Sequence, residues 1–256
     1  PVDLMPIDYT YKALDFLPAI NFLRRKLNIP TSRSRDLMGR KNDWAFAVAG
    51  ATKAQLLTDL RDAVDKAIAD GESLGQFRRR FDSAVQDAGW DYRGGRNWRT
   101  KIVYQTNLRT SYQAGRAQQI DAVRDERPYL MYRHGGSRVP RERHVTPPPD
   151  GWNGLVLRSD DPWWDTHFPP NGWGCSCGVF TLSARDLERR DLTVGEAPEV
   201  ETYEDVDPET GTVREVPKGI DPGWAYKPGS AQERTEQKAQ LRRTIAELPP
   251  PLRDPA

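Results

Sequence analysis

The chain has 256 residues, which is enough for one full-sized domain or two small ones, so it needs no disulfide framework to fold. Its hydrophobic fraction of 37% is low and its charged fraction of 29% is high, which predicts a modest core with long loops or arms. The net charge of +1 argues against a uniformly basic surface, and the sequence has no long apolar stretch and no signal peptide. We therefore expect no membrane association and a protein that is made and used in a cytoplasm.

Residues 1–50 are predicted to form an N-terminal helix and a connector arm. Apolar side chains recur three or four residues apart between Ala13 and Leu27, which is typical of one helix face. Residues 28–43 have no such periodicity. Residues 43–50 alternate large and small apolar side chains, so we expect a short strand there.

Residues 51–127 are predicted to be a helical part. Two helices are expected to begin at capping boxes, in which a hydroxyl and an amide satisfy free N–H groups. The boxes are Thr52 with Gln55 and Ser73 with Gln76. A further helix is expected between residues 98 and 127, where a face of small side chains predicts close packing against a neighbour: Thr106, Thr110, Ala114 and Ala117.

Residues 128–185 are predicted to be a loop-rich β region. Short β-type runs bounded by Gly, Pro or Asp occur at 129–132, 154–157 and 178–181. Pro-rich loops lie between these runs, and four of the eight tryptophans fall in the same region, at positions 152, 163, 164 and 173. Together with the helical part, the runs predict an α+β fold.

Residues 186–256 are predicted to be an acidic extended arm that ends in a polar C-terminal helix. Within residues 186–216 there are 11 Asp and Glu against 3 Arg, which is typical of an exposed segment that becomes ordered on a partner. A third capping box, Ser230 with Glu233, precedes a helix whose apolar residues are only Leu241, Ile245 and Leu248. We expect that helix to be marginal without a partner.

The two cysteines, Cys175 and Cys177, are too close in sequence for an unstrained disulfide and are expected to be reduced. His144 and His167 precede them in the same predicted β region. Thiolates and imidazoles are natural zinc ligands, so these four residues predict a structural zinc knot in a segment poor in hydrophobic residues. The alternative is that the cysteines are small buried side chains and the histidines hydrogen-bond locally.

Catalytic interpretations of the same region have less support. A cysteine nucleophile would need a base and an orienting carboxylate, such as His144 or His167 with Asp161 or Asp165, but no local signature accompanies them. A metal-dependent hydrolase would need an open coordination position and a poised carboxylate. We expect a protein that is not an enzyme.

The charge of the chain is unevenly distributed. Residues 72–145 contain 15 Lys and Arg against 8 Asp and Glu. Arginines among Trp90, Tyr92 and Trp98 are suited to phosphate contacts and to stacking on nucleic acid. The candidate contact residues, for nucleic acid or for a protein partner, are Arg78, Arg79, Arg80, Arg93, Arg96 and Arg99. The alternative, which we favour, is that these arginines solvate helix faces or pair with the acidic segment.

The β region contains the runs Arg141 to His144, Asp150-Gly151, Ser159 to Asp165 and Phe168 to Cys177, of which the last two are rich in proline, tryptophan or cysteine. They resemble the signature of the phage Mu F-like head morphogenesis proteins, the minor head proteins of tailed phages and prophages. Segments 46–50, 71–77 and 106–116 are similar to the helical half of that family. The resemblance covers about residues 13–185, and Ser176 stands where the family usually has Arg.

The resemblance implies a structural, low-copy component of the procapsid rather than an enzyme. Its implied partners are the portal protein, the major capsid or scaffolding protein and packaged phage DNA. Its implied location is the virion, inside the head near the portal, after assembly in the host cytoplasm. Two alternatives remain: a metal-dependent nuclease, hydrolase or nucleotide-using transferase that acts during packaging, and an internal DNA-binding protein.

Overall fold

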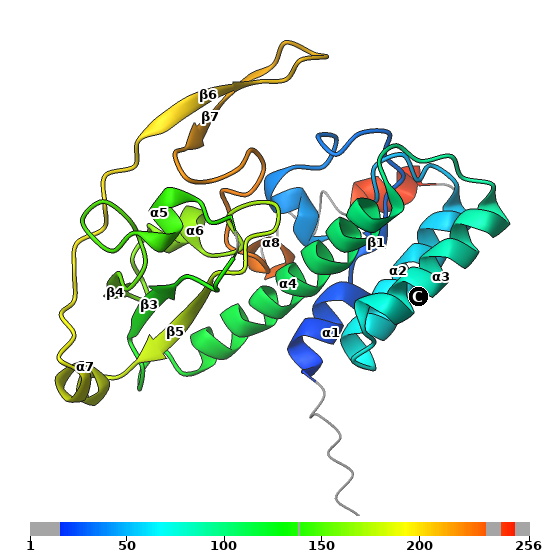
Figure 1. The fold of residues 1–256 in the computed structure, drawn as a ribbon. Coiled ribbons are helices and arrows are strands. Elements are labelled where there is room, and N and C mark those ends of the chain that lie inside the picture. The colour runs from blue at the N-terminus through cyan, green and yellow to red at the C-terminus, as the bar shows by residue number, and fades with distance from the viewer. Residues whose placement is uncertain (1–15, 138, 234–241, 249–256) are drawn as a thin grey trace, which may run out of the picture.

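The computed structural model describes residues 16–137, 139–233 and 242–248. In these ranges the protein has an α+β fold, in which a helical half packs beside a small sheet region and the C-terminal segment contacts both (Figure 1). The expected fold class is therefore confirmed. No helix in the described ranges is long and apolar enough to cross a membrane.

The helical half consists of α1 (Leu17–Arg24), α2 (Ala54–Ala69), α3 (Leu74–Ala88) and α4 (Arg96–Ala122). Helices α2 and α3 form a hairpin whose apolar faces share one core with part of α4; its fully buried members include Leu57, Leu60, Phe77 and Phe81. Ser73 caps α3 as predicted, because its hydroxyl accepts from the Gln76 N–H while the Gln76 side chain accepts from the Ser73 N–H.

The predicted capping box at Thr52 is wrong. Helix α2 begins at Ala54, and the residue before it, Lys53, makes no side-chain cap. The Lys53 ammonium instead donates to the carbonyl oxygen of Ala88, 2.6 Å away at the end of α3. A contact between two helix ends therefore replaces the local motif at this position.

Helix α4 packs closely against its neighbour α1, and the closest approach is at Gly115. The small side chains named from the sequence are buried elsewhere: Ala117 joins the core of the sheet region, and Ala114 lies beside Gly229. Gly115 has so little room that a Cβ atom there would lie 2.8 Å from the backbone nitrogen of Ala19 and 2.9 Å from the Phe16 ring. The two helices approach to a distance that only glycine permits.

The connector between α1 and α2 is mostly irregular. Strands β1 (Leu27–Asn28) and β2 (Ala45–Phe46) form a parallel pair, and the 3-10 helix η1 (Gly39–Asp43) lies between them in sequence. The strand expected within residues 43–50 is thus present but only two residues long.

The sheet region has β3 (Tyr129–Arg133) at its centre, with β4 (Val156–Arg158) and β5 (Gly178–Leu182) on either side, both antiparallel to it. All three predicted strands are confirmed. The loops between them include the one-turn helices α5 (Glu142–Val145) and α6 (Trp164–His167). Three of the four tryptophans of these loops are buried: Trp152, Trp163 and Trp164 form a core with the C-terminal part of α4, whereas Trp173 is exposed.

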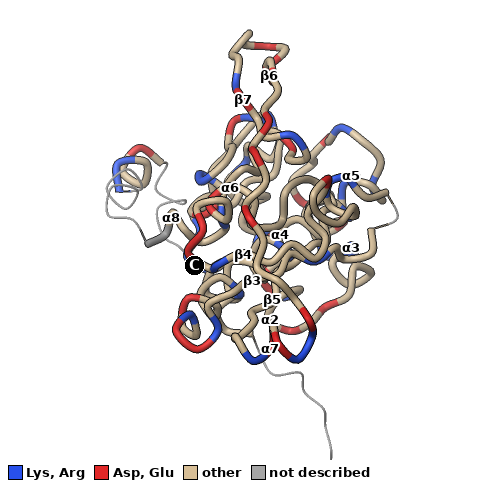
Figure 2. The backbone as a smooth tube through the Cα atoms, turned by 90° about the vertical axis from the view of Figure 1, so that its left-hand side faces the viewer, with Lys and Arg blue, Asp and Glu red and all other residues tan. Residues whose placement is uncertain are grey.

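The C-terminal segment is more closely packed than the predicted arm. It contains α7 (Ala184–Arg190), β6 (Thr202–Val206), β7 (Val213–Pro217) and α8 (Ser230–Glu233). The β6–β7 hairpin stands out from the body in two views (Figures 1 and 2). Beyond it the chain returns and buries Ile220, Trp224 and Tyr226, so this part contributes to the core.

Acidic residues of this segment pair with arginines that are distant in sequence. Bidentate bonds join Arg35 to Asp205, and further ion pairs join Arg33 to Asp207 and Arg143 to Glu201. Figure 2 shows the resulting distribution, with both signs of charge spread together over this side of the molecule. Part of the acidic segment is therefore paired within its own chain.

The predicted C-terminal helix is described only in part. Residue Leu241 lies outside the described residues, and residues 242–247 are helical. Ile245 and Leu248 pack against Leu27, so the connector supplies the apolar partner that this helix needs.

Candidate metal centre

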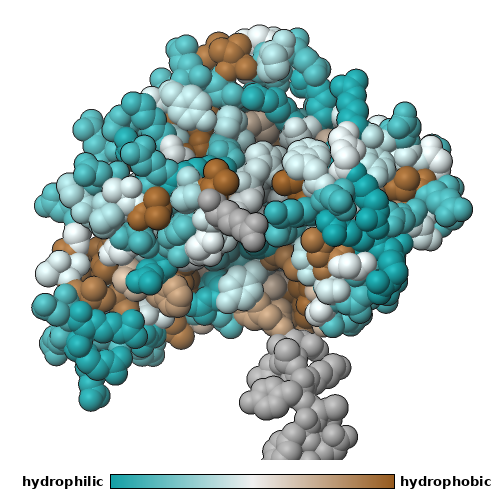
Figure 3. All heavy atoms as spheres, viewed as in Figure 1, coloured by the Kyte–Doolittle hydropathy of each residue, from teal (hydrophilic) through white to brown (hydrophobic). Residues whose placement is uncertain are grey.

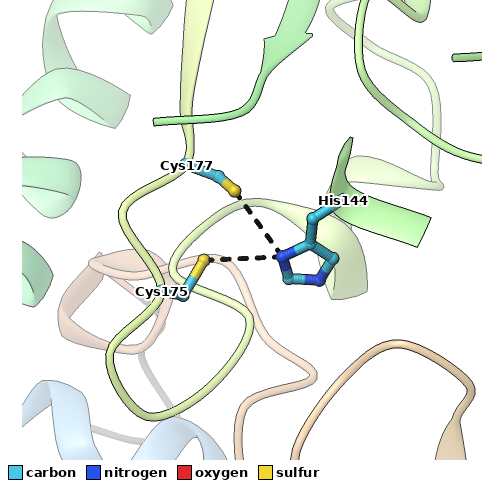
Figure 4. A group of neighbouring side chains, drawn as sticks. All are labelled: His144, Cys175 and Cys177. Atoms are coloured by element: carbon cyan, nitrogen blue, oxygen red, sulfur yellow. Dashed lines mark hydrogen bonds between the residues drawn. The ribbon is translucent and has the colours of Figure 1, made fainter. Parts of the chain in front are cut away.

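Three buried side chains meet where the sheet region approaches α4. His144 lies in α5, and Cys175 and Cys177 lie in the loop that leads into β5. The two sulfurs converge on the same imidazole nitrogen, Nδ1, at 3.8 Å from Cys175 and 3.5 Å from Cys177 (Figure 4). The ligand atoms of all three residues lie within 4.8 Å of one another.

Aromatic packing fixes the position of the His144 ring. The ring stacks on the Trp152 indole with centroids 4.9 Å apart, and Tyr132 meets its edge. Tyr132 belongs to the central strand β3, and its hydroxyl donates to the Asn171 side chain 2.9 Å away. The tryptophan-rich sequence of this region thus supplies the walls of the site.

The cysteine loop is held by α4. Arg109 donates to the carbonyl oxygens of Gly174 and Cys175, and Gln113 donates to that of Cys177. Arg109 and Gln113 are four residues apart, so they lie on one face of the helix. Sequence reasoning missed both residues; the only signal was two polar side chains at helical spacing next to the small-residue face.

The hydrogen bond at the other ring nitrogen determines the tautomer of His144. Its Nε2 lies 2.8 Å from the carbonyl oxygen of Gly219, and a carbonyl oxygen can only accept. The proton is therefore on Nε2, and the lone pair of Nδ1 faces the two sulfurs. A histidine that ligates a metal is typically oriented by such a bond from its second nitrogen.

The two thiols differ in their affinity for a proton. The pKa of Cys175 is well below its ordinary value, chiefly because Cys177 hydrogen-bonds to the thiolate. The pKa of Cys177 is raised because it shares its proton with Cys175 and is buried.

The geometry suits a tetrahedral metal. A zinc ion at about 2.3 Å from sulfur and about 2.0 Å from nitrogen places those atoms about 3.5 Å apart, close to the separations found here. The same separations also suit thiol hydrogen bonds to the imidazole. In the described ranges no fourth His, Cys, Asp or Glu joins the group. One coordination position would therefore be taken by water or by the Tyr132 hydroxyl beside Cys177.

The structure does not bring His167 into this group. The His167 ring stacks on Trp163 with centroids 4.3 Å apart and meets the edge of Trp152. Its Nδ1 lies 2.7 Å from the Thr166 hydroxyl, and burial lowers its pKa to about 4. The one-turn helix α6 directs this histidine into the aromatic core, where it is a neutral packing residue.

Most of the candidate contact arginines are engaged within the helical half. Arg80 pairs with Glu72, and Arg96 pairs with Asp82. Arg78 donates to Thr100 and to the Asn97 carbonyl, and Arg99 donates to the Ala49 carbonyl. Arg79 and Arg93 are exposed. Among these six arginines, the two that form ion pairs do so with Glu72 and Asp82 and not with the acidic segment at residues 186–216.

Comparisons with known proteins agree with the resemblance found in the sequence. Residues 58–180 match the family described as Phage Mu protein F like protein. The chain carries a Mu F-like region. This region includes α3, α4, β3, β4, the first residues of β5 and all three residues of the candidate metal centre.

Two curated relatives extend the similarity beyond that region. The chain is 31% identical to the "Putative capsid assembly protein F" of Escherichia phage Mu, over 93% of this chain and 60% of that protein. It is 34% identical to the "Mu-like prophage FluMu F protein" of Haemophilus influenzae, over 73% of this chain and 50% of that protein. The chain thus spans between half and two thirds of each relative. No solved structure matches it significantly.

Proposed function

We propose that this Mu F-like chain is a structural protein of phage head assembly and not an enzyme. The observation that carries the proposal is the similarity along 93% of the chain to the phage Mu F protein, which is named as a putative capsid assembly protein. The burial of the candidate metal centre supports a structural role, because His144, Cys175 and Cys177 are at most 4% exposed.

The finer proposal concerns place and partners. As a minor head protein, the chain would lie in the virion, inside the head near the portal, and would contact the portal protein and the major capsid or scaffolding protein. Its described surface offers apolar residues in small groups among hydrophilic ones (Figure 3). Exposed aromatic residues such as Trp98, Tyr112 and Phe180 are available for such contacts.

We propose zinc as the occupant of the His144, Cys175 and Cys177 site, in a structural role. Three protein ligands with one open position are also typical of catalytic zinc. However, catalytic zinc needs access for a substrate and a carboxylate or similar base, and in the described ranges no Asp or Glu joins this buried group. The ion would instead fix the loops that enclose it.

Direct contact with packaged DNA has less support. A polyanion is attracted by exposed and unpaired cations. Of the six candidate arginines, Arg80 and Arg96 are neutralised by carboxylates, whereas Arg78 and Arg99 donate to neutral groups within the helical half. Any contact by this group would depend mainly on the exposed Arg79 and Arg93.

The test is reconstitution of the head. Major capsid, scaffolding and portal proteins of the same phage are expressed together with the chain, and the particles are purified and analysed by quantitative mass spectrometry. We expect the chain at low copy number in the particles, and fewer regular particles when it is left out. Regular particles that form equally well without it and exclude it would overturn the proposal.

A further inference from the structure

A cavity of about 490 Å³ lies apart from the candidate metal centre. Three parts of the chain line it: the connector between residues 26 and 49, one face of α4 between residues 98 and 110, and the C-terminal return between residues 222 and 226 with Trp173. Its size falls within the range of about 300–1,000 Å³ that is typical of ligand pockets. None of the three candidate metal ligands lines it.

The charged residues that line this cavity are all basic. They are Lys26, Arg33 and Arg99, and no Asp or Glu is among the described lining residues. Arg33 is already neutralised by Asp36, Asp207 and Glu209. Lys26 is buried and lies close enough to Asp43 to interact with it electrostatically.

Arg99 differs from these two cations. No carboxylate in the described part of the chain pairs with it; its Nη2 donates to the Ala49 carbonyl at 2.7 Å, and the guanidinium lies over the Trp90 ring. Its Nε is buried and has no hydrogen-bond partner. A partly buried guanidinium with an unused donor is costly unless an anion satisfies it. The cavity therefore offers one uncompensated positive charge.

Other lining groups complement such an anion. Thr106 lies two helical turns after Arg99 on the same face of α4, and its buried hydroxyl also lacks a partner. Trp98 and Trp173 line the cavity and remain 58% and 45% exposed. Exposed tryptophans beside an apolar pocket are typical anchors for an aromatic or aliphatic group of a binding partner.

We propose that this cavity binds a carboxylate-bearing peptide segment of another head protein, with the carboxylate on Arg99 and an adjacent apolar side chain against Trp98 and Trp173. The partner's class rests on the proposed function. A carboxylate matches the single free guanidinium, whereas a nucleotide phosphate carries about two negative charges and would require more cations. A peptide bound there would connect the helical half to the C-terminal return.

The experiment uses the full chain labelled with ¹⁵N and follows the Trp Nε1–H and Arg Nε–H signals by NMR. Three probes are titrated: acetyl-Phe-Glu-amide with a side-chain carboxylate, acetyl-Gln-Phe with a terminal carboxylate, and the neutral acetyl-Phe-Gln-amide. We expect at least one acidic probe to bind about tenfold more tightly than the neutral one, as a charged hydrogen bond to arginine implies. The tighter acidic probe identifies the source of the carboxylate.

Matched variants locate the effect. Arg99→Gln is expected to reduce the ratio of affinities for the acidic and neutral probes to about twofold or less. Arg96→Gln lies on the same helix but outside the cavity, and it is expected to leave this ratio unchanged. Thr106→Val, which keeps the side-chain shape, is expected to weaken the acidic probe without loss of thermal stability. This variant keeps the test valid if Arg99→Gln unfolds the chain.

Equal binding of acidic and neutral probes, no binding of any probe, or tighter binding of adenosine monophosphate than of the peptides would overturn the assignment. So would an equal loss of preference in Arg96→Gln. These outcomes are distinct from a failure of the proposed function, because that is judged by whether particles contain the chain.

Discussion

The imidazole of His144 donates its Nε2–H to the carbonyl oxygen of Gly219, which lies 75 residues further along the chain. This bond links the candidate metal centre to the C-terminal return and leaves Nδ1 free to face Cys175 and Cys177. The return therefore takes part in the chemistry of the site, although it contributes no ligand.

The first prediction concerns metal content. We expect purified protein to contain about one zinc per chain by inductively coupled plasma mass spectrometry, since the three ligands form one site. His144→Gln and Cys175→Ser are expected to reduce the zinc content to near zero and to lower the melting temperature. His167→Gln is the matched control and is expected to retain zinc. If the purified protein contains no zinc and Cys175→Ser leaves its stability unchanged, the two cysteines are simply buried thiols and not metal ligands.

The second prediction concerns pH. Burial lowers the pKa of His167 to about 4, below the value of about 6.5 in an unfolded chain. Protonation therefore favours the unfolded state, so the stabilisation is complete above about pH 6.5 and is lost as the pH falls towards 4. The unfolding free energy, measured by urea denaturation, should fall between pH 7 and pH 4.5 in the parent protein. In His167→Phe this fall should be smaller by on the order of 2 kcal/mol. Identical pH profiles for the two proteins would contradict this assignment.

The third prediction concerns the contact between α1 and α4. Gly115→Ala places a Cβ atom 2.8 Å from the Ala19 nitrogen, so α1 must shift. We expect a loss of about 1–3 kcal/mol in unfolding free energy, as for other overpacked sites. Gly75→Ala in α3 meets only the Ser73 hydroxyl at 3.8 Å and should be neutral or stabilising by up to about 1 kcal/mol. Equal effects of the two substitutions would show that the contact is looser than described.

The fourth prediction concerns the β6–β7 hairpin. Arg35 holds it through two bonds to Asp205, and both side chains are partly accessible to water. Arg35→Ala should increase amide hydrogen exchange in residues 202–217, while global stability changes by less than about 1 kcal/mol. Arg190→Ala, on α7, is the control and should not change exchange in the hairpin. Unchanged hairpin exchange in Arg35→Ala would mean that other contacts anchor it.

Local patterns predicted the elements that depend on local interactions. The strands at 129–132, 154–157 and 178–181 follow from β-type runs between breakers, and the start of α3 follows from Ser73. The Thr52 box predicted helix α2 but not its cap, because the helix begins at Ala54 and Lys53 bonds to the end of α3. Local signals thus identified the helix, whereas the contact at its first turn depends on a distant residue.

The candidate site was predicted by residue type rather than by geometry. Cysteine and histidine chemistry identified His144, Cys175 and Cys177, but it also suggested His167, which packs on Trp163. The support from Arg109 was not predictable, because it requires knowing that α4 crosses the cysteine loop. Pairing of the acidic segment with arginines was anticipated and occurs at Arg143 with Glu201, but its pairing with the connector residue Arg33, 174 residues from Asp207, was not.

The pairing of that acidic segment with arginines of its own chain has a consequence for encounter rates. Charges of opposite sign that lie within a few ångströms cancel at distances beyond the Debye length of about 10 Å at 0.1 M salt. The carboxylates that are paired in this way therefore add little to the long-range field that an approaching protein meets, and they add little to electrostatic steering. Recruitment through these paired residues should consequently depend little on ionic strength and would be governed by how well the two shapes fit.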